Sequence, residues 1–118
     1  MKKVFYLSTC STCRNIIKEV GFPEDIEFFD LKIAPISEGD LDYMYKLAGS
    51  YEELFSKKAK KYSALKDELK TESDFKCWLL KEYTFLKRPV VVYLDFISIG
   101  NDKGAVEKIK FKFGLSAV

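Results

Sequence analysis

The sequence predicts an α/β fold in a single domain. Short β-rich runs lie near both ends of the chain, and amphipathic helical runs lie between them. The 118 residues are 47% hydrophobic and 15% aromatic. This composition can bury one substantial core and leaves little room for a second. We therefore expect one domain that spans 1–118.

The first third of the chain predicts a β-α-β unit. The run "KKVFYL", at 2–7, is rich in strand-forming residues. It is followed by "CRNIIKEVGF", in which apolar residues recur at helical spacing before Gly21. "DIEFFDL", at 25–31, then alternates acidic and apolar residues, as a strand does. A helix between two strands favours a parallel pair.

The middle of the chain, about 37–84, predicts a helical insertion. A helix is expected at "SEGDLDYMYKLA", where Ser37 can cap the start and Gly49 ends the pattern. "YEELF" predicts a further short helical piece. The aromatic and aliphatic side chains of "SDFKCWLLKEY", at 73–83, can share one broad helical face. We expect Cys77, which lies in this helix, to be part of the core.

The last part predicts a β-β-α unit. In "LKRPVVVYLDFISIGNDKG", two β-branched runs joined by a turn near Asp95 indicate an antiparallel hairpin. "AVEKIKFKFG" predicts a closing amphipathic helix, although its late alternation leaves a strand open. The order β-α-β, helices, β-β-α is that of a thioredoxin-like (glutaredoxin-like) fold with a helical insertion.

The stretch "LSTCSTCRN", at 7–15, places Cys10 and Cys13 between the first predicted strand and the first predicted helix. Unpaired backbone N–H groups and the positive end of the helix dipole stabilise an anion there, so the thiolate of Cys10 is favoured. Cys13 would follow one turn later, within reach of a disulfide. Three interpretations stay open: a redox pair, half of a metal site, and two small buried residues.

A metal site fits the composition poorly. A structural zinc site needs about four ligands, whereas the chain has no histidine and only one cysteine besides the pair. A Cys-x5-Arg phosphatase loop is excluded because Ile16 stands six residues after Cys10. The glycine patterns of dinucleotide folds and of P-loops are missing as well. We therefore expect no metal and no cofactor.

Charge and hydropathy exclude several classes of partner. The net charge of +2 is too small to predict direct nucleic-acid binding, and no apolar run approaches the roughly 20 residues of a membrane span. The apolar run from Val4 to Leu7 is shorter than the roughly 7–15 residues of a signal peptide's apolar region. We expect a cytoplasmic protein, in which a close cysteine pair is reactive or metal-bound rather than a permanent structural disulfide.

Two arginines and a proline join the cysteines as candidate site residues. Arg14 directly follows the pair and could raise the local positive potential, although a solvated surface arginine is equally consistent. In "KRPVVV", at 87–92, Pro89 precedes a strand and restricts Arg88 to extended geometry. Thioredoxin-like folds hold a cis-proline loop here that faces the cysteine motif. We therefore expect Arg88 near the pair as an anion-binding or thiolate-stabilising group.

Taken together, these motifs resemble the arsenate reductase (ArsC) family and its relative Spx, the thiol-sensing transcription regulators. The resemblance covers essentially the whole chain and rests on "CSTCRN", on "LFSKKAKKYSAL" with Tyr62 in place, and on "LKRPVVV" followed by "SIG". It implies that Cys10 is the cysteine that attacks arsenate and that Arg88 is the arginine before the cis-proline. It also implies a small thiol, glutaredoxin or thioredoxin as electron donor.

The chain departs from this family pattern at the oxyanion site. Members linked to glutaredoxin surround the oxyanion with three arginines. Here the middle position falls near Ser56, followed by Lys57 and Lys58, and the late position falls in "FISIG", which has no arginine. Lysine supplies charge but not the bidentate geometry of a guanidinium. The lysine run at 57–61 is also typical of a solvated surface.

Three functional interpretations remain, of which the third is a domain that only keeps the fold. In the first, the chain is a thiol-dependent reductase in which Cys10 attacks and Cys13 resolves the intermediate as an intramolecular disulfide. In the second, it is a Spx-like regulator whose cysteine pair is a reversible disulfide switch and whose partner is RNA polymerase. The sequence does not separate the first two.

Overall fold

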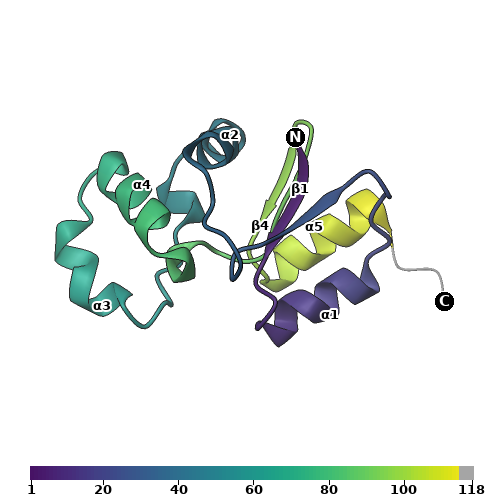
Figure 1. Cartoon of the computed structure of the whole chain (residues 1–118), viewed down its shortest axis with the longest axis horizontal. Coiled ribbons are helices and arrows are strands. Elements are labelled where there is room, and N and C mark those ends of the chain that lie inside the picture. Colours follow the sequence, from purple (N-terminus) through teal and green to yellow (C-terminus); the bar gives the residue numbers. More distant parts are fainter. Residues whose placement is uncertain (115–118) are drawn as a thin grey trace. The chain divides into compact units, whose positions relative to one another are not determined.

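The computed structural model describes residues 1–114, which form parts of two compact units (Figure 1). The first, called the sheet unit here, consists of Met1–Ala34 and the described chain from Arg88 onward. The second, called the helical unit, is Pro35–Lys87. Each unit is described by itself.

The sheet unit contains a four-stranded mixed sheet with the strand order β2-β1-β3-β4. Its strands are β1 (Lys2–Tyr6), β2 (Glu27–Asp30), β3 (Val90–Tyr93) and β4 (Phe96–Ile99). β1 pairs in parallel with β2 and antiparallel with β3, and β3 pairs antiparallel with β4. The predicted parallel pair and the predicted C-terminal hairpin are both confirmed. The hairpin turns at Leu94 and Asp95, where Leu94 adopts the left-handed φ of 57° that favoured two-residue loops use.

Two helices of the sheet unit, α1 (Ser11–Glu19) and α5 (Lys103–Phe113), pack on one face of the sheet (Figure 1). The core of this layer consists of aliphatic side chains from the sheet, both helices and the loop before β2: Val4, Ile16, Val20, Ile26, Val91 and Ile109. The segment "AVEKIKFKFG", for which the sequence allowed either a helix or a strand, forms most of the helix α5. Asp102 caps it by accepting a hydrogen bond from the Ala105 N–H at 2.8 Å.

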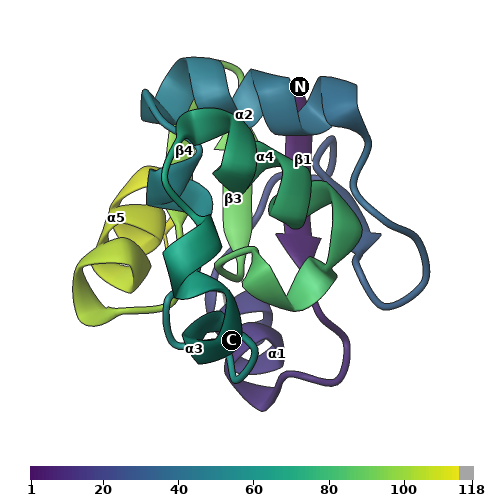
Figure 2. The ribbon, with the colours of Figure 1, turned by 90° about the vertical axis from the view of Figure 1, so that its left-hand side faces the viewer.

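The helical unit consists of short helices (Figure 2). These are α2 (Glu38–Ala48), η1 (Glu52–Leu54), α3 (Tyr62–Leu65), η2 (Lys66–Glu68), α4 (Glu72–Lys81) and η3 (Tyr83–Phe85), where η marks a 3-10 helix. Both predicted ends of α2 are confirmed: the Ser37 side chain accepts from the Asp40 N–H, and Gly49 closes the helix with φ 91°. Phe55 stacks on Phe85 with ring centroids 4.7 Å apart and anchors the core of this unit.

Cys77 is exposed, so the expectation that it belongs to the core is wrong. The helix α4 starts with a capping box between Thr71 and Asp74, and its buried residues are Phe75 and Leu79. These two lie four residues apart and share one face. Cys77 lies midway between them in sequence and therefore points to the opposite side of the helix.

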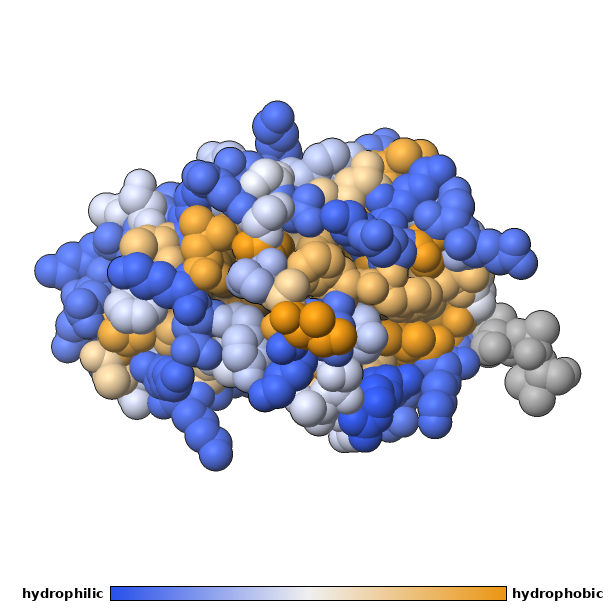
Figure 3. Space-filling model, viewed as in Figure 1, coloured by the Kyte–Doolittle hydropathy of each residue, from blue (hydrophilic) through white to orange (hydrophobic). Residues whose placement is uncertain are grey.

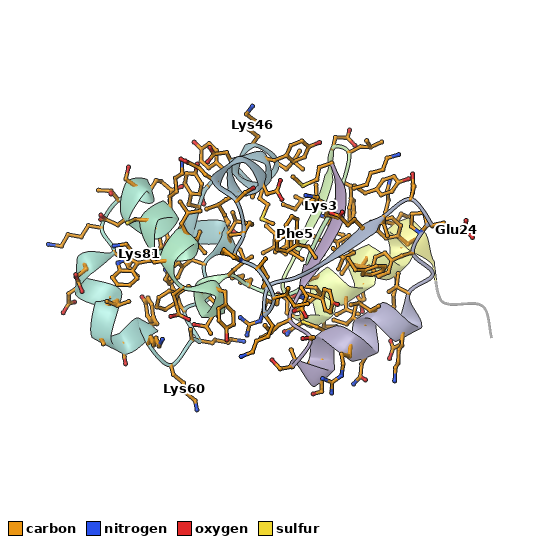
Figure 4. The ribbon with its side chains drawn as sticks, viewed as in Figure 1. Lys3, Phe5, Glu24, Lys46, Lys60 and Lys81 are labelled. Carbon is orange, nitrogen blue, oxygen red and sulfur yellow. The ribbon has the colours of Figure 1, made fainter. Side chains whose placement is uncertain are left out.

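The surface carries both charged side chains and a few large exposed apolar ones, among them Ile33 and Phe111. In the face drawn in Figure 3, hydrophilic side chains protrude beyond the apolar ones. Lys60, in the lysine run at 57–61, is exposed and points away from the ribbon in Figure 4. This fits the solvated surface that the run predicts. None of the helices within residues 1–114 combines the length and the apolar character that crossing a membrane requires.

Candidate functional site

Cys10 lies at the junction of a β-turn and the helix α1. The turn begins where β1 ends, and the Cys10 N–H donates to the Leu7 carbonyl at 2.9 Å across it. Cys10 is then the N-cap of α1, with an extended backbone (φ −94°, ψ 111°), and its carbonyl accepts from the Arg14 N–H at 3.1 Å. The cysteine therefore stands where the sequence predicted it, beside the unpaired N–H groups of the first helical turn.

The two cysteines of the motif differ in exposure. Cys10 is half-buried, whereas Cys13, in the first turn of α1, is 0% exposed. Both thiols are free. Cys13 lies three positions before the buried Ile16 and shares its inward face of α1, whereas Cys10 precedes the helix as its N-cap. A large reactant can therefore reach Cys10 more easily than Cys13.

The ionisation of Cys10 is favoured by its surroundings. Burial raises the pKa of its thiol, but the backbone N–H and the thiol of Cys13, the backbone N–H of Thr12 and the positive charge of Arg88 together lower the pKa below its ordinary value. A thiol is a weak acceptor, and the Cys10 side chain makes no capping hydrogen bond in this structure. The thiolate is the form that these N–H groups stabilise.

Cys13 shows the opposite tendency. Burial raises the pKa of Cys13 to about 11, and the neighbouring Cys10 adds to this rise through hydrogen bonding and charge. The backbone of Leu7 and the charge of Arg88 act in the other direction but do not offset it. At neutral pH Cys13 is therefore protonated, and Cys10 is the more readily ionised thiol of the pair.

Arg88 and Pro89 belong to the sheet unit and immediately precede β3. The Arg88–Pro89 peptide bond is cis, and the Pro89 carbonyl accepts from the Gly100 N–H at 3.0 Å. The Arg88 charge favours the ionised form of both cysteines. The structure thus brings this arginine, which lies far from the cysteines in sequence, into their electrostatic range.

Arg14 lies at the surface and turns back toward the turn before α1. Its Nη1 donates to the Ser8 carbonyl at 2.7 Å. On the other side of the same residue, the Ser8 N–H donates to Asp30 Oδ1 at 3.1 Å. Sequence reasoning missed Asp30. An acidic residue at the end of the second strand of a parallel pair was the available signal, since such strands end at the same edge of the sheet.

The lysine run lies in the helical unit, where two of its members form ion pairs. Lys57 pairs with Glu52, and Lys61 pairs with Glu82 at 2.8 Å. Burial does not shield these pairs, so they contribute little to stability. Among residues 1–114, no cluster of three or more histidine, cysteine or acidic side chains is placed to hold a metal ion.

Comparison with known families assigns the chain. The model of the ArsC family matches residues 5–109, which is most of the sequence and includes every candidate site residue. The chain belongs to the ArsC family. This membership supports a thiol-dependent redox protein, because ArsC proteins generally work with thiol-based electron donors such as glutaredoxin or thioredoxin.

Solved structures agree with this assignment at the level of the fold. A candidate arsenate reductase from Yersinia pestis is 19% identical with a TM-score of 0.73, over 92% of this chain and 100% of that one. A candidate arsenate reductase from Streptococcus mutans is 23% identical with a TM-score of 0.69, over 94% and 98%. An ArsC-related protein from Brucella melitensis is 18% identical with a TM-score of 0.63, over 92% and 93%. No curated protein matches the chain. The fold is thioredoxin-like, as the order of the elements predicted.

Proposed function

We propose that the protein is a thiol-dependent oxidoreductase in which Cys10 is the nucleophile and Cys13 the resolving cysteine. The observation that carries the proposal is that two neighbouring thiols differ in exposure and in the direction in which their pKa values are shifted. The pKa of the half-buried Cys10 is lowered, and that of the buried Cys13 is raised to about 11. A redox pair needs this asymmetry, because one sulfur has to attack first while the other waits.

The reaction fits a disulfide substrate. The Cys10 thiolate attacks one sulfur of the substrate, the S–S bond breaks, and the second sulfur leaves as a thiolate that takes up a proton. Cys13 then loses its proton and attacks Cys10 Sγ, which releases the other substrate sulfur as a thiol and forms the Cys10–Cys13 disulfide. The substrate gains two electrons, and the protein loses two. Two equivalents of a small thiol, or reduced glutaredoxin or thioredoxin, return the protein to the dithiol.

The remaining candidate residues support this chemistry. Arg88 supplies positive charge that stabilises the thiolate and can hold an anionic group of the substrate. Pro89 fixes the chain beside Arg88, and Arg14 adds charge while it holds the Ser8 carbonyl. The mechanism uses no metal or other cofactor and needs neither nucleic acid nor a membrane.

A second function is favoured by the Cys-x-x-Cys motif itself. The same reversible disulfide could switch a Spx-like regulator whose partner is RNA polymerase. In that case, oxidation would change binding, and no substrate would turn over. The two functions share the cysteine chemistry and differ in whether the protein turns over substrate in repeated cycles of oxidation and reduction.

A parallel assay separates them. The purified protein is tested for reduction of a glutathionylated peptide and of arsenate, each with glutathione and glutaredoxin or with thioredoxin, and for retention of RNA polymerase in a pulldown. We expect multiple turnovers with the disulfide substrate, loss of turnover in Cys10→Ser, and no loss in Cys77→Ser, whose exposed thiol lies in the helical unit. Polymerase retention without turnover would replace the reductase by the regulator.

A further inference from the structure

The turn that carries Cys10 is held at its central residue from two sides. In the turn from Leu7 to Cys10, Ser8 occupies the first central position. Its N–H donates to Asp30 Oδ1 at 3.1 Å, and its carbonyl accepts from Arg14 Nη1 at 2.7 Å. The side chains of Asp30 and Arg14 thus fix both the N–H and the carbonyl of Ser8.

Asp30 reaches the turn because of the sheet register. β1 and β2 run in parallel with Tyr6 opposite Asp30, and the Leu31 N–H donates to the Tyr6 carbonyl at 2.8 Å. Asp30 therefore lies beside Tyr6, the last residue of β1, next to the turn that follows. The same Oδ1 accepts from the Lys32 N–H at 3.0 Å. One carboxylate oxygen thus ties the loop after β2 to the turn before α1.

The carboxylate is ionised at neutral pH and so is available as an acceptor. Burial raises the pKa of Asp30, but its hydrogen bonds with Ser8 and Lys32 lower the pKa below the ordinary range. Hydrogen bonds to an ionised acceptor are roughly twice as strong as those between neutral groups. Asp30 can therefore restrain the turn as an ionised acceptor at neutral pH.

Restraint of the turn matters for Cys10 because its ionisation depends on placement. The thiolate is favoured by the N–H groups of Thr12 and Cys13 and by the charge of Arg88. Hydrogen bonds weaken steeply once their angle or distance degrades. If the turn moved, Sγ would lose these donors, although every donor would still be present.

We infer that Asp30 is a positioning residue for Cys10: through Ser8 it holds the turn that presents the thiolate to the N–H groups at the start of α1. The inference rests on the proposed role of Cys10 as nucleophile. It adds a residue that is adjacent to neither cysteine in the sequence and that acts on Cys10 through Ser8.

The sign of the effect distinguishes placement from charge. Asp30 is negative, so a purely electrostatic action would disfavour the Cys10 thiolate, and its removal would lower the pKa of Cys10. Loss of placement acts in the opposite direction. Asp30→Ala removes both the charge and the acceptor, whereas Asp30→Asn removes the charge and keeps an oxygen at the same position.

The experiment measures the rate of iodoacetamide labelling of Cys10 against pH by mass mapping, in a Cys77→Ser background. For Asp30→Ala we expect the midpoint to rise by about 0.5–1 pH unit, which slows labelling below the midpoint about three- to tenfold. Asp30→Asn should stay at or below the midpoint of the unsubstituted background. Asp25→Ala is the matched control, since Asp25 pairs with Lys2 at 2.7 Å near the start of β1, at the other end of that strand.

An unchanged or lowered midpoint in Asp30→Ala overturns the inference, and so does an equal rise in Asp30→Asn. If Asp30→Ala does not fold, NMR of the unsubstituted protein decides. The Ser8 and Lys32 amide resonances should titrate together, with one midpoint below the ordinary aspartate value of about 3.9, and their independence overturns the inference. Labelling does not depend on turnover, so failure of the reductase assay and failure of this inference are separate results.

Discussion

Cys10 and Cys13 lie one helical turn apart at the start of α1, yet their surroundings shift the pKa values of their thiols in opposite directions. The backbone N–H and thiol of Cys13 stabilise the Cys10 thiolate, and Cys10 in turn raises the pKa of Cys13. The two residues therefore form one unit in which ionisation of the outer sulfur keeps the inner sulfur protonated. This coupling gives the pair an order of reaction.

Mild oxidation should produce a disulfide between Cys10 and Cys13 and leave Cys77 free. The pair occupies adjacent positions on one turn in the sheet unit, whereas Cys77 is exposed on α4 in the helical unit. Peptide mass mapping after treatment with oxidised glutathione checks the pairing. Cys77→Ser should not change the yield of the bridge. A main product that joins Cys77 to either of the other cysteines would contradict the assignment.

Alkylation at rising pH should label Cys10 first. Only the thiolate reacts, so labelling of Cys10 should increase up to its lowered pKa and level off at a lower pH than labelling of an ordinary cysteine does. Cys13 should label appreciably only as the pH approaches its pKa of about 11, provided the protein is still folded. Cys13→Ser should leave rapid labelling of Cys10 in place and trap mixed disulfides with small thiols. Faster labelling of Cys13 at neutral pH would reverse the proposed roles.

The sequence predicted the parts of the site that depend on local geometry. A cysteine that follows a strand and precedes a helix has to meet the free N–H groups of the first turn, so the place of Cys10 could be inferred from order alone. Ser37 and Gly49 marked the two ends of α2 for the same reason, since capping needs only neighbours along the chain. These contacts span four residues or fewer and can be read from the sequence.

Contacts between distant residues could not be inferred in this way. The hydrogen bond between Ser8 and Asp30 joins residues 22 positions apart and requires the register of β1 against β2. The exposure of Cys77 depends on which face of α4 packs against the core, and the capping box at Thr71 starts the helix at Glu72, one residue before the expected run. The broad apolar face that was expected is therefore narrower, with only Phe75 and Leu79 buried.

Arsenate should be a poor substrate. Of the three arginines that surround the oxyanion in the reductases this chain resembles, only Arg88 has a counterpart here. Each lost charge-assisted contact to an oxyanion is worth about 1.5–3 kcal/mol. Two lost contacts should slow arsenate reduction at least about a hundredfold relative to a three-arginine member of the family. Steady-state assays with glutathione and glutaredoxin check this. If reduction proves fast, the double variant Lys57→Ala, Lys58→Ala tests whether these lysines take the place of the missing arginine.

Replacement of Arg88 should slow the reaction of Cys10 without unfolding the protein. Its positive charge favours the Cys10 thiolate, so Arg88→Ala should raise the pKa of Cys10. A rise of about 0.5–1 pH unit would slow labelling below the midpoint about three- to tenfold. Arg88→Lys keeps the charge, and it should retain most of the rate if the role is electrostatic. The labelling rates of all three proteins are compared at one pH below the midpoint, after circular dichroism has shown that each is folded.

The two Arg88 variants also separate thiolate stabilisation from substrate binding. A charge that acts on Cys10 changes labelling by neutral iodoacetamide, whereas a group that only holds an anionic substrate does not. If Arg88→Ala labels at the unsubstituted rate but turns over a glutathionylated peptide slowly, the arginine binds substrate and the N–H groups of Thr12 and Cys13 stabilise the thiolate without it. If both rates fall in Arg88→Ala and both recover in Arg88→Lys, one charge serves both steps. Unchanged labelling and turnover in Arg88→Ala would remove Arg88 from the site.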